Sequence, residues 1–128
     1  MKTWAPLLGR VLLIAIFIDS GVGKIMHPTQ TMGYMAAKGM PMVGLFLVLA
    51  IICELAGSLS VLLGFFTKWG AAILIIFMIP ATFIFHSEFA DQIQKIMFMK
   101  NVSMTGGLLL LMAFGPGEWS IDGRKSNS

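Results

Sequence analysis

Four long apolar segments constrain the fold of this 128-residue chain more than any other feature. They span about residues 6–23, 42–64, 69–86 and 96–115. Each is close to the roughly 20 residues that an α-helix needs to cross about 30 Å of hydrocarbon. Because 57% of the residues are hydrophobic and only 12% are charged, polar side chains cannot cover the apolar surface of a soluble globule. We predict an all-α integral membrane protein, an antiparallel four-helix bundle.

The first apolar segment also has some features of a secretory signal peptide. Lys2 supplies a basic start, but Arg10, Asp19 and Lys24 interrupt or flank the apolar run. Residues 20–23 match a cleavage site only weakly. We therefore predict that the segment is retained as the first membrane helix.

Four spans place both chain termini on one side of the membrane, together with the short turn at 65–68. That turn is short enough to predict a hairpin between the second and third helices. Pro28 and Thr29 predict a short interfacial helix between the first two spans, ended by residues 39–41. The predicted domain covers residues 1–117, and the polar tail at 118–128 is predicted to be loose.

Charges and cysteines narrow the classes of function. Cys53 is the only cysteine, so the chain cannot form an intrachain disulfide or a thiolate metal cluster. The basic residues are scattered singly, which argues against nucleic acid as a partner. Cations near the helix ends slightly favour the side that carries the termini, so the positive-inside rule predicts cytoplasmic termini.

Glu54 is the most informative polar residue, because it lies near the middle of the second span. It follows Met42 by 12 residues, or about 18 Å of helix. A carboxyl group at that depth must be neutral or paired, which makes it a functional candidate. The residues that share its helical face are mostly small, which predicts that Glu54 points into the bundle: Ala50, Ile51, Gly57 and Ser58.

Other ionisable or polar side chains gather toward the opposite leaflet from the termini: Asp19, Lys24, His86, Lys100 and Asn101. Simpler interpretations exist for some of them, since lysines extend to the lipid headgroups and a histidine often caps a helix end. Arg10 enters from the other end, where it either reaches the headgroups or extends inward to Glu54. Pro80 leaves the carbonyl of Ile76 without its helical donor, and such gaps often adjoin ligand or water sites.

These residues resemble the pattern of the DoxX family of small bacterial inner-membrane proteins. The resemblance covers about residues 7–124, and its motifs are Arg10, Ser20-Gly21-x-x-Lys24, Gly39-x-Pro41, Glu54 with Gly57, Gly64-Phe65-Phe66-Thr67, His86, Lys100-Asn101, Gly106-Gly107 and Gly115-Pro116-Gly117 to Asp122. The resemblance implies a four-helix bundle in the plasma membrane. The family is named after a subunit of a thiosulfate:quinone oxidoreductase. Asp19 departs from the pattern, since the family usually has an apolar residue there.

The resemblance leads to the hypothesis of a quinone-linked membrane oxidoreductase subunit. In it, His86 and Lys100 hydrogen-bond the ring oxygens and Glu54 exchanges protons, while Arg10, Lys24, Asn101 and Asp19 belong to the binding site. The sequence contains no flavin, haem or iron–sulfur motif, so a protein partner would supply the electrons.

Two other classes remain open, a non-catalytic assembly or scaffold subunit and a small-solute transporter. Besides the lipid bilayer, the expected partner is another protein or a second copy of the chain, in a homo-oligomer. The methionines and histidines near the loop side match no tight ligand set, so no metal site is predicted.

Overall fold

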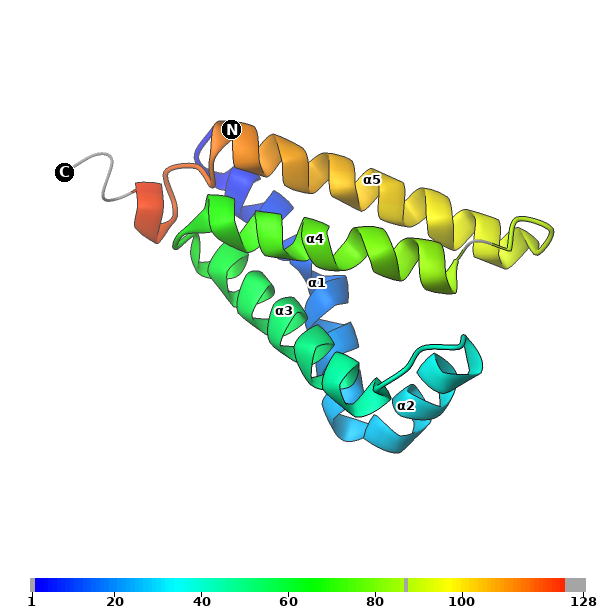
Figure 1. The fold of residues 1–128 in the computed structure, drawn as a ribbon. Helices are drawn as coiled ribbons and strands as arrows, with labels where there is room; N and C mark the ends of the chain where they lie inside the picture. Colours follow the sequence, from blue (N-terminus) through cyan, green and yellow to red (C-terminus); the bar gives the residue numbers. More distant parts are fainter. Residues whose placement is uncertain (1, 87, 124–128) are drawn as a thin grey trace.

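The computed structural model describes residues 2–86 and 88–123, which form five main helices and no strand (Figure 1). The helices are α1 (Trp4–Met26), α2 (Pro28–Ala37), α3 (Val43–Leu63), α4 (Thr67–Phe85) and α5 (Gln92–Phe114). Four of them, all except α2, are long and apolar enough to cross a membrane. The prediction of four membrane helices with a short helix between the first two is confirmed.

Two helix boundaries differ from the predicted ones for local reasons. Helix α5 begins at Gln92 because the side chain of Asp91 accepts a hydrogen bond of 3.0 Å from the backbone N–H of Ile93. Helix α1 continues past Gly21 and Gly23 as far as Met26. Gly21 is buried there, and a Cβ on it would come 2.7 Å from Leu55 of α3. This glycine therefore serves helix packing and does not end the helix.

Neighbouring helices pack in the order α1, α3, α4, α5. One apolar core joins all four, and its buried members are Ile14, Phe17, Val61, Ala71, Leu74, Met78 and Leu108. The α3–α4 turn, the start of α1 and residues 118–123 lie at one end of the molecule, which we call the terminal end (Figure 1). Helix α2 and the α4–α5 connection lie at the other end, which we call the loop end.

Helices α3 and α4 touch closely near the turn that joins them. A Cβ on Gly57 would lie 2.8 Å from the Leu74 side chain and 3.1 Å from the carbonyl oxygen of Gly70. Such small residues let helix backbones approach in a membrane. Toward the loop end, the pair α1 and α3 diverges from the pair α4 and α5 (Figure 1). The closest packing is therefore at the terminal end, and the helices separate at the loop end.

Arg10 holds the terminal end together. Its Nη1 donates hydrogen bonds of 2.9 Å to the carbonyls of Val61 and Leu62, and its Nη2 donates to the carbonyl of Trp119. The last carbonyls of a helix lack helical donors and carry partial negative charge, which explains why a buried cation is accommodated there. Arg10 thus connects α1, the end of α3 and the chain that follows α5.

Residues 118–123 differ from the loose tail that the sequence suggested. Ser120 is buried, and the backbone N–H of Asp122 donates to the carbonyl of Gly64 at 2.7 Å. The Asp122 carboxylate accepts hydrogen bonds from the backbone N–H groups of Phe66 and Thr67. The polar residues that looked like a solvated tail instead cap the N-terminus of α4. Residues 124–128 lie outside the described residues.

A candidate ligand cavity between the diverging helices

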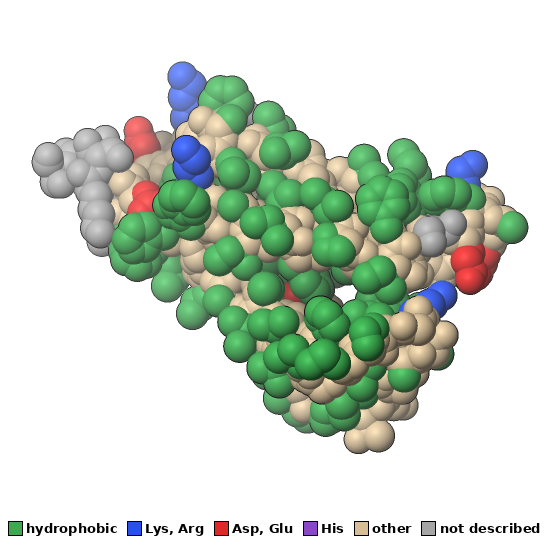
Figure 2. All heavy atoms as spheres, in the orientation of Figure 1, with side chains coloured by type: hydrophobic (Ala, Val, Ile, Leu, Met, Phe, Trp, Pro, Cys, Tyr) green, Lys and Arg blue, Asp and Glu red, His purple; other side chains and the backbone are tan. Residues whose placement is uncertain are grey.

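A cavity of about 620 Å³ lies between the diverging helix pairs. Figure 2 shows this hollow walled mainly by hydrophobic side chains, with an acidic side chain visible inside it. Every helix contributes to the lining, and the aromatic members are Phe17, Tyr34, Phe46, Phe77 and Phe85. Glu54 is the only acidic residue among the lining residues. The cavity is therefore apolar in most of its wall and has one negatively charged position, at Glu54.

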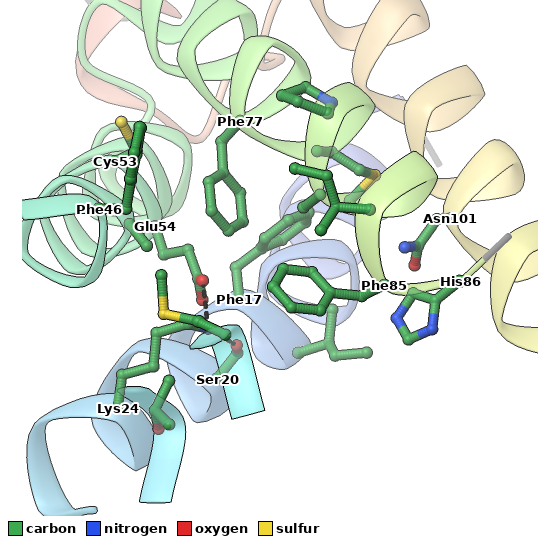
Figure 3. Close-up of a pocket in the computed structure, with 18 of the residues that line it drawn as sticks. Phe17, Ser20, Lys24, Phe46, Cys53, Glu54, Phe77, Phe85, His86 and Asn101 are labelled. Carbon is green, nitrogen blue, oxygen red and sulfur yellow. Dashed lines mark hydrogen bonds and ion pairs between the residues drawn. The ribbon is translucent and has the colours of Figure 1, made fainter. Parts of the chain in front are cut away.

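That charge belongs to an ion pair between α1 and α3. Lys24 Nζ lies 2.6 Å from Glu54 Oε1 and donates a second hydrogen bond of 2.7 Å to Ser20 Oγ (Figure 3). The Glu54 side chain is 1% exposed and that of Lys24 is 19% exposed. Ser20 precedes Lys24 by one helical turn, so both reach the same side of α1. The Lys24 ammonium also lies 5.9 Å from the centre of the Phe77 ring.

In the part of the chain that the structure describes, the second carboxylate oxygen of Glu54 has no such hydrogen-bond donor. Oε2 is buried and has no hydrogen-bond partner among the described residues. Ala50, Gly57 and Ser58 are buried on the same side of α3, which confirms that Glu54 faces the interior, whereas Ile51 is only half-buried. Leaving a buried acceptor unsatisfied costs free energy, so this oxygen is the natural contact for a donor on a ligand.

A second polar group lies across the cavity, at the end of α4 and on α5. His86 Nδ1 is 2.9 Å from Gln94 Oε1, and Asn101 Nδ2 donates a 3.0 Å hydrogen bond to Thr82 Oγ1. His86, Lys100 and Asn101 all line the cavity. Figure 3 shows His86 and Asn101 on the side of Phe85 away from the Glu54 and Lys24 pair. The polar residues therefore form two groups separated by apolar wall.

The structure brings together five of the seven residues that the sequence analysis singled out. Glu54, His86, Lys100, Lys24 and Asn101 line the same cavity. Arg10 and Asp19 are not among its lining residues. Arg10 bonds to backbone carbonyls at the terminal end and does not reach Glu54. Asp19 is exposed on α1.

Most residues of the cavity were not among the seven site candidates, and four examples are Ser20, Tyr34, Cys53 and Phe77. Ser20 and Lys24 are one turn apart, and that spacing is a signal that could have paired them. Cys53 precedes Glu54, and Phe77 precedes Pro80 by one turn, but neither spacing indicates a cavity. Tyr34 stacks on Phe85 with ring centres 5.3 Å apart, a contact between α2 and α4 that has no sequence signature.

This cavity suits a small molecule whose body is apolar and whose head group is polar. Its volume is within the range of about 300 to 1,000 Å³ that ligand pockets usually have. Among the described residues, no three His, Cys, Asp or Glu side chains gather closely enough to hold a metal ion. The fold and the cavity together define a small membrane protein of four spans, with a ligand-sized pocket that contains an ion pair.

Comparisons with known proteins show which family this chain belongs to. The DoxX family model matches residues 5–87, so the chain belongs to the DoxX family. A second model, that of the SURF4 family, matches residues 60–127.

Two similar proteins come from Escherichia coli strain K12. Inner membrane protein YqjF is 43% identical over 91% of this chain and 88% of its own length. Inner membrane protein YphA is 36% identical over 92% of this chain and 88% of its own length. The Surfeit locus protein 4 homolog of Schizosaccharomyces pombe is 29% identical over 97% of this chain but only 38% of its own length. No solved structure matches the chain. These relatives and the four apolar helices support a multi-pass inner-membrane location.

Proposed function

We propose that this DoxX protein is the membrane subunit of a quinone-linked oxidoreductase and that the cavity between the helix pairs receives the quinone. The observation that carries the proposal is the buried pair of Glu54 and Lys24 inside an otherwise apolar cavity. A carboxylate at this depth is costly in a membrane unless it is partnered and used. A quinone site needs an apolar chamber with few polar groups, and this cavity has that composition.

The lining residues fit the two parts of a quinone. His86, Lys100 and Asn101 carry hydrogen-bonding groups at one side of the cavity, and Glu54 with Lys24 carries them at the other. Aromatic and aliphatic side chains between them provide contact area for a ring and an isoprenoid tail. A bound quinone would supply two-electron redox chemistry, and Glu54 would hold or release a proton beside it. The sequence has no flavin, haem or iron–sulfur motif, so the proposal includes a partner protein as electron donor.

Copurification tests this function. Protein extracted from its native membrane in a mild detergent should retain quinone, measured by solvent extraction and mass spectrometry. We expect Glu54→Gln and His86→Ala to lose most of it, and Lys95→Gln, an exposed position outside the cavity, to retain it. Unchanged quinone content in both cavity variants would contradict the proposal.

An assembly role is the second candidate, and the position of the ion pair favours it. Lys24 and Glu54 connect α1 to α3, so the pair also fixes how these helices align. If alignment is its only role, replacing both residues by apolar ones should leave cellular function intact. A folded double variant that has lost function would argue against this alternative.

We also propose that both termini are cytoplasmic. Lys2 and Lys68 lie at the terminal end. Arg124 and Lys125 lie outside the described residues but follow that end closely in the sequence. Lys24, Lys38 and Lys95 lie toward the loop end, so the excess of positive charge is on the side of the termini. A fluorescent protein fused to either terminus should fluoresce. A phosphatase that is active only in the periplasm should be inactive in the same positions. Active phosphatase would reverse the assignment.

A further inference from the structure

We infer that the cavity takes its ligand sideways from the bilayer, through an opening between α3 and α4, and that it prefers a head group that donates a hydrogen bond. The inference rests on the cavity of the proposed function and names its ligand class: a lipid-dissolved molecule with an apolar tail and a hydroxyl head. For a quinone couple, this means that the hydroxyl-bearing reduced form binds better than the oxidised form.

The rim of the opening consists of apolar residues that face both the cavity and the outside. Phe46 and Leu49 on α3 and Ile84 on α4 line the cavity, and each is still exposed on the molecular surface. Pro80 and Phe77 continue the same edge of α4 toward the middle of the membrane. A gap whose edges are apolar at the depth of the acyl chains admits lipid-soluble molecules at little cost.

Toward water, α2 covers the cavity. Tyr34 and Met35 on α2 belong to the lining, and the Tyr34 ring stacks on Phe85 at the end of α4. Beyond this contact, Lys38 lies 3.8 Å from Glu88 in the α4–α5 connection. Glu88 is 73% exposed, so that ion pair is weak and the aromatic contact is the main closure. The route between α3 and α4 has no comparable contact among the described residues.

The head-group preference follows from how the Glu54 carboxylate is satisfied. Oε1 accepts from Lys24, whereas Oε2 is buried and has no partner among the described residues. An ionised carboxylate can only accept hydrogen bonds. A carbonyl oxygen on a ligand cannot satisfy Oε2, but a hydroxyl can donate to it. Figure 3 shows the Glu54 side chain extending from α3 into the space where Phe17, Phe77 and Lys24 meet.

Two redox-inactive probes isolate this preference: para-decylphenol and its methyl ether, each with a photoactivatable diazirine in the alkyl chain. The two probes differ in one hydrogen-bond donor, the phenol O–H group, and neither is a quinone or a hydroquinone. At equal mole fraction in proteoliposomes, we expect the phenol probe to label the protein about ten-fold more than the ether, as a hydrogen bond to a charged group implies. Peptide mapping should place the labels on the rim of α3 and α4.

Paired tryptophan variants test the opening itself. Leu49 is a rim residue with 45% of its surface exposed, and Ile52 on the same helix is 56% exposed but outside the cavity. We expect Leu49→Trp to block the opening and reduce labelling by the phenol probe several-fold. Ile52→Trp adds the same bulk to the same helix and should leave labelling unchanged, which controls for folding and membrane insertion.

The outcomes separate this inference from the proposed function. Equal labelling by the phenol and its ether would overturn the head-group preference, and full labelling of Leu49→Trp would overturn the lateral opening. Either result can occur while quinone still copurifies, in which case the proposed function stands without the inference. A strong phenol preference in a protein that retains no quinone would support the inference and count against the redox role.

Discussion

At the scale of single residues, Glu54 and Lys24 decide what the cavity can do. Glu54 is 1% exposed and its partner is reached only because α1 and α3 pack side by side. The free energy of such a pair is a balance between the cost of removing both charges from water and their attraction at short distance. Breaking the pair is therefore much more damaging than replacing both members.

The first prediction uses this asymmetry. Lys24→Met leaves the Glu54 carboxylate buried without its cation and should lower the free energy of unfolding by about 3 kcal/mol. The double variant Lys24→Met with Glu54→Leu removes both charges and should recover most of that loss. Unfolding in mild detergent, followed by circular dichroism, gives both values. A double variant that is less stable than Lys24→Met would contradict the prediction.

At the scale of helices, the contact between α3 and α4 sets where the cavity can begin. Gly57 and Gly70 face one another across this contact, and neither site has room for a Cβ. Nearer the loop end, the cavity-facing positions on the same helices hold Phe46, Phe77 and Phe85. Small residues close to the turn and aromatic residues away from it therefore produce one tight end and one open end.

The second prediction concerns Gly57→Ala. The added methyl would lie 2.8 Å from Leu74 Cγ and 3.1 Å from a backbone carbonyl, so α3 and α4 must move apart. We expect a loss of about 1 to 3 kcal/mol in the free energy of unfolding, typical of overpacking. Gly44→Ala is the matched control, because a Cβ there meets nothing within 4 Å and lies in the same helix. Equal stability of both variants would show that the contact is not tight.

The third prediction concerns the cap that the C-terminal segment places on α4. Asp122 accepts hydrogen bonds from the backbone N–H groups of Phe66 and Thr67 and from the Thr67 hydroxyl. Asp122→Ala leaves these donors without that acceptor and should cost about 1 to 2 kcal/mol, as loss of an N-cap does. Thermal unfolding in detergent measures the change. Glu118→Ala, an exposed position in the same segment, should change stability far less, and an equal effect would refute a capping role.

At the scale of the whole molecule, the two ends are held together differently. The terminal end combines the Arg10 hydrogen bonds, the Asp122 cap and the glycine contact between α3 and α4. At the loop end, the cavity separates the helix pairs. Among residues 2–86 and 88–123, α2 and the residue that ends it bridge the pairs through the contact of Tyr34 with Phe85 and the exposed ion pair of Lys38 with Glu88. A protein opens locally at the lowest free-energy cost in such weakly packed regions.

The fourth prediction follows from this difference. Hydrogen exchange in detergent micelles should be faster for amides of α2 and the first half of α5 than for amides of α3 and α4 near their turn. The expected order reflects the free energy of local opening, which falls where buried contacts are few. Mass spectrometry of peptides from the two ends measures it. Uniform protection along α5 would contradict a weakly held loop end.

Much of the fold follows from local sequence, because a helix that crosses a membrane satisfies its own backbone and needs only about 20 apolar residues. The spans, the short helix after Pro28 and the inward face of Glu54 were predictable for this reason. Lys24, His86, Lys100 and Asn101 were also predicted to lie toward the loop side, and Glu54 near the middle of the membrane; all five line the cavity.

Only the tertiary structure decided which polar groups meet. From the sequence, Arg10 was the residue considered as a partner for Glu54. In the folded chain, Lys24 pairs with Glu54, and Arg10 binds carbonyls at the end of α3. The packing of residues 118–123 against the α3–α4 turn could not be predicted from the sequence either, because its hydrogen bonds join residues more than 50 positions apart. Helix formation is local and can be predicted from composition and spacing, whereas pairings between helices depend on how whole surfaces pack.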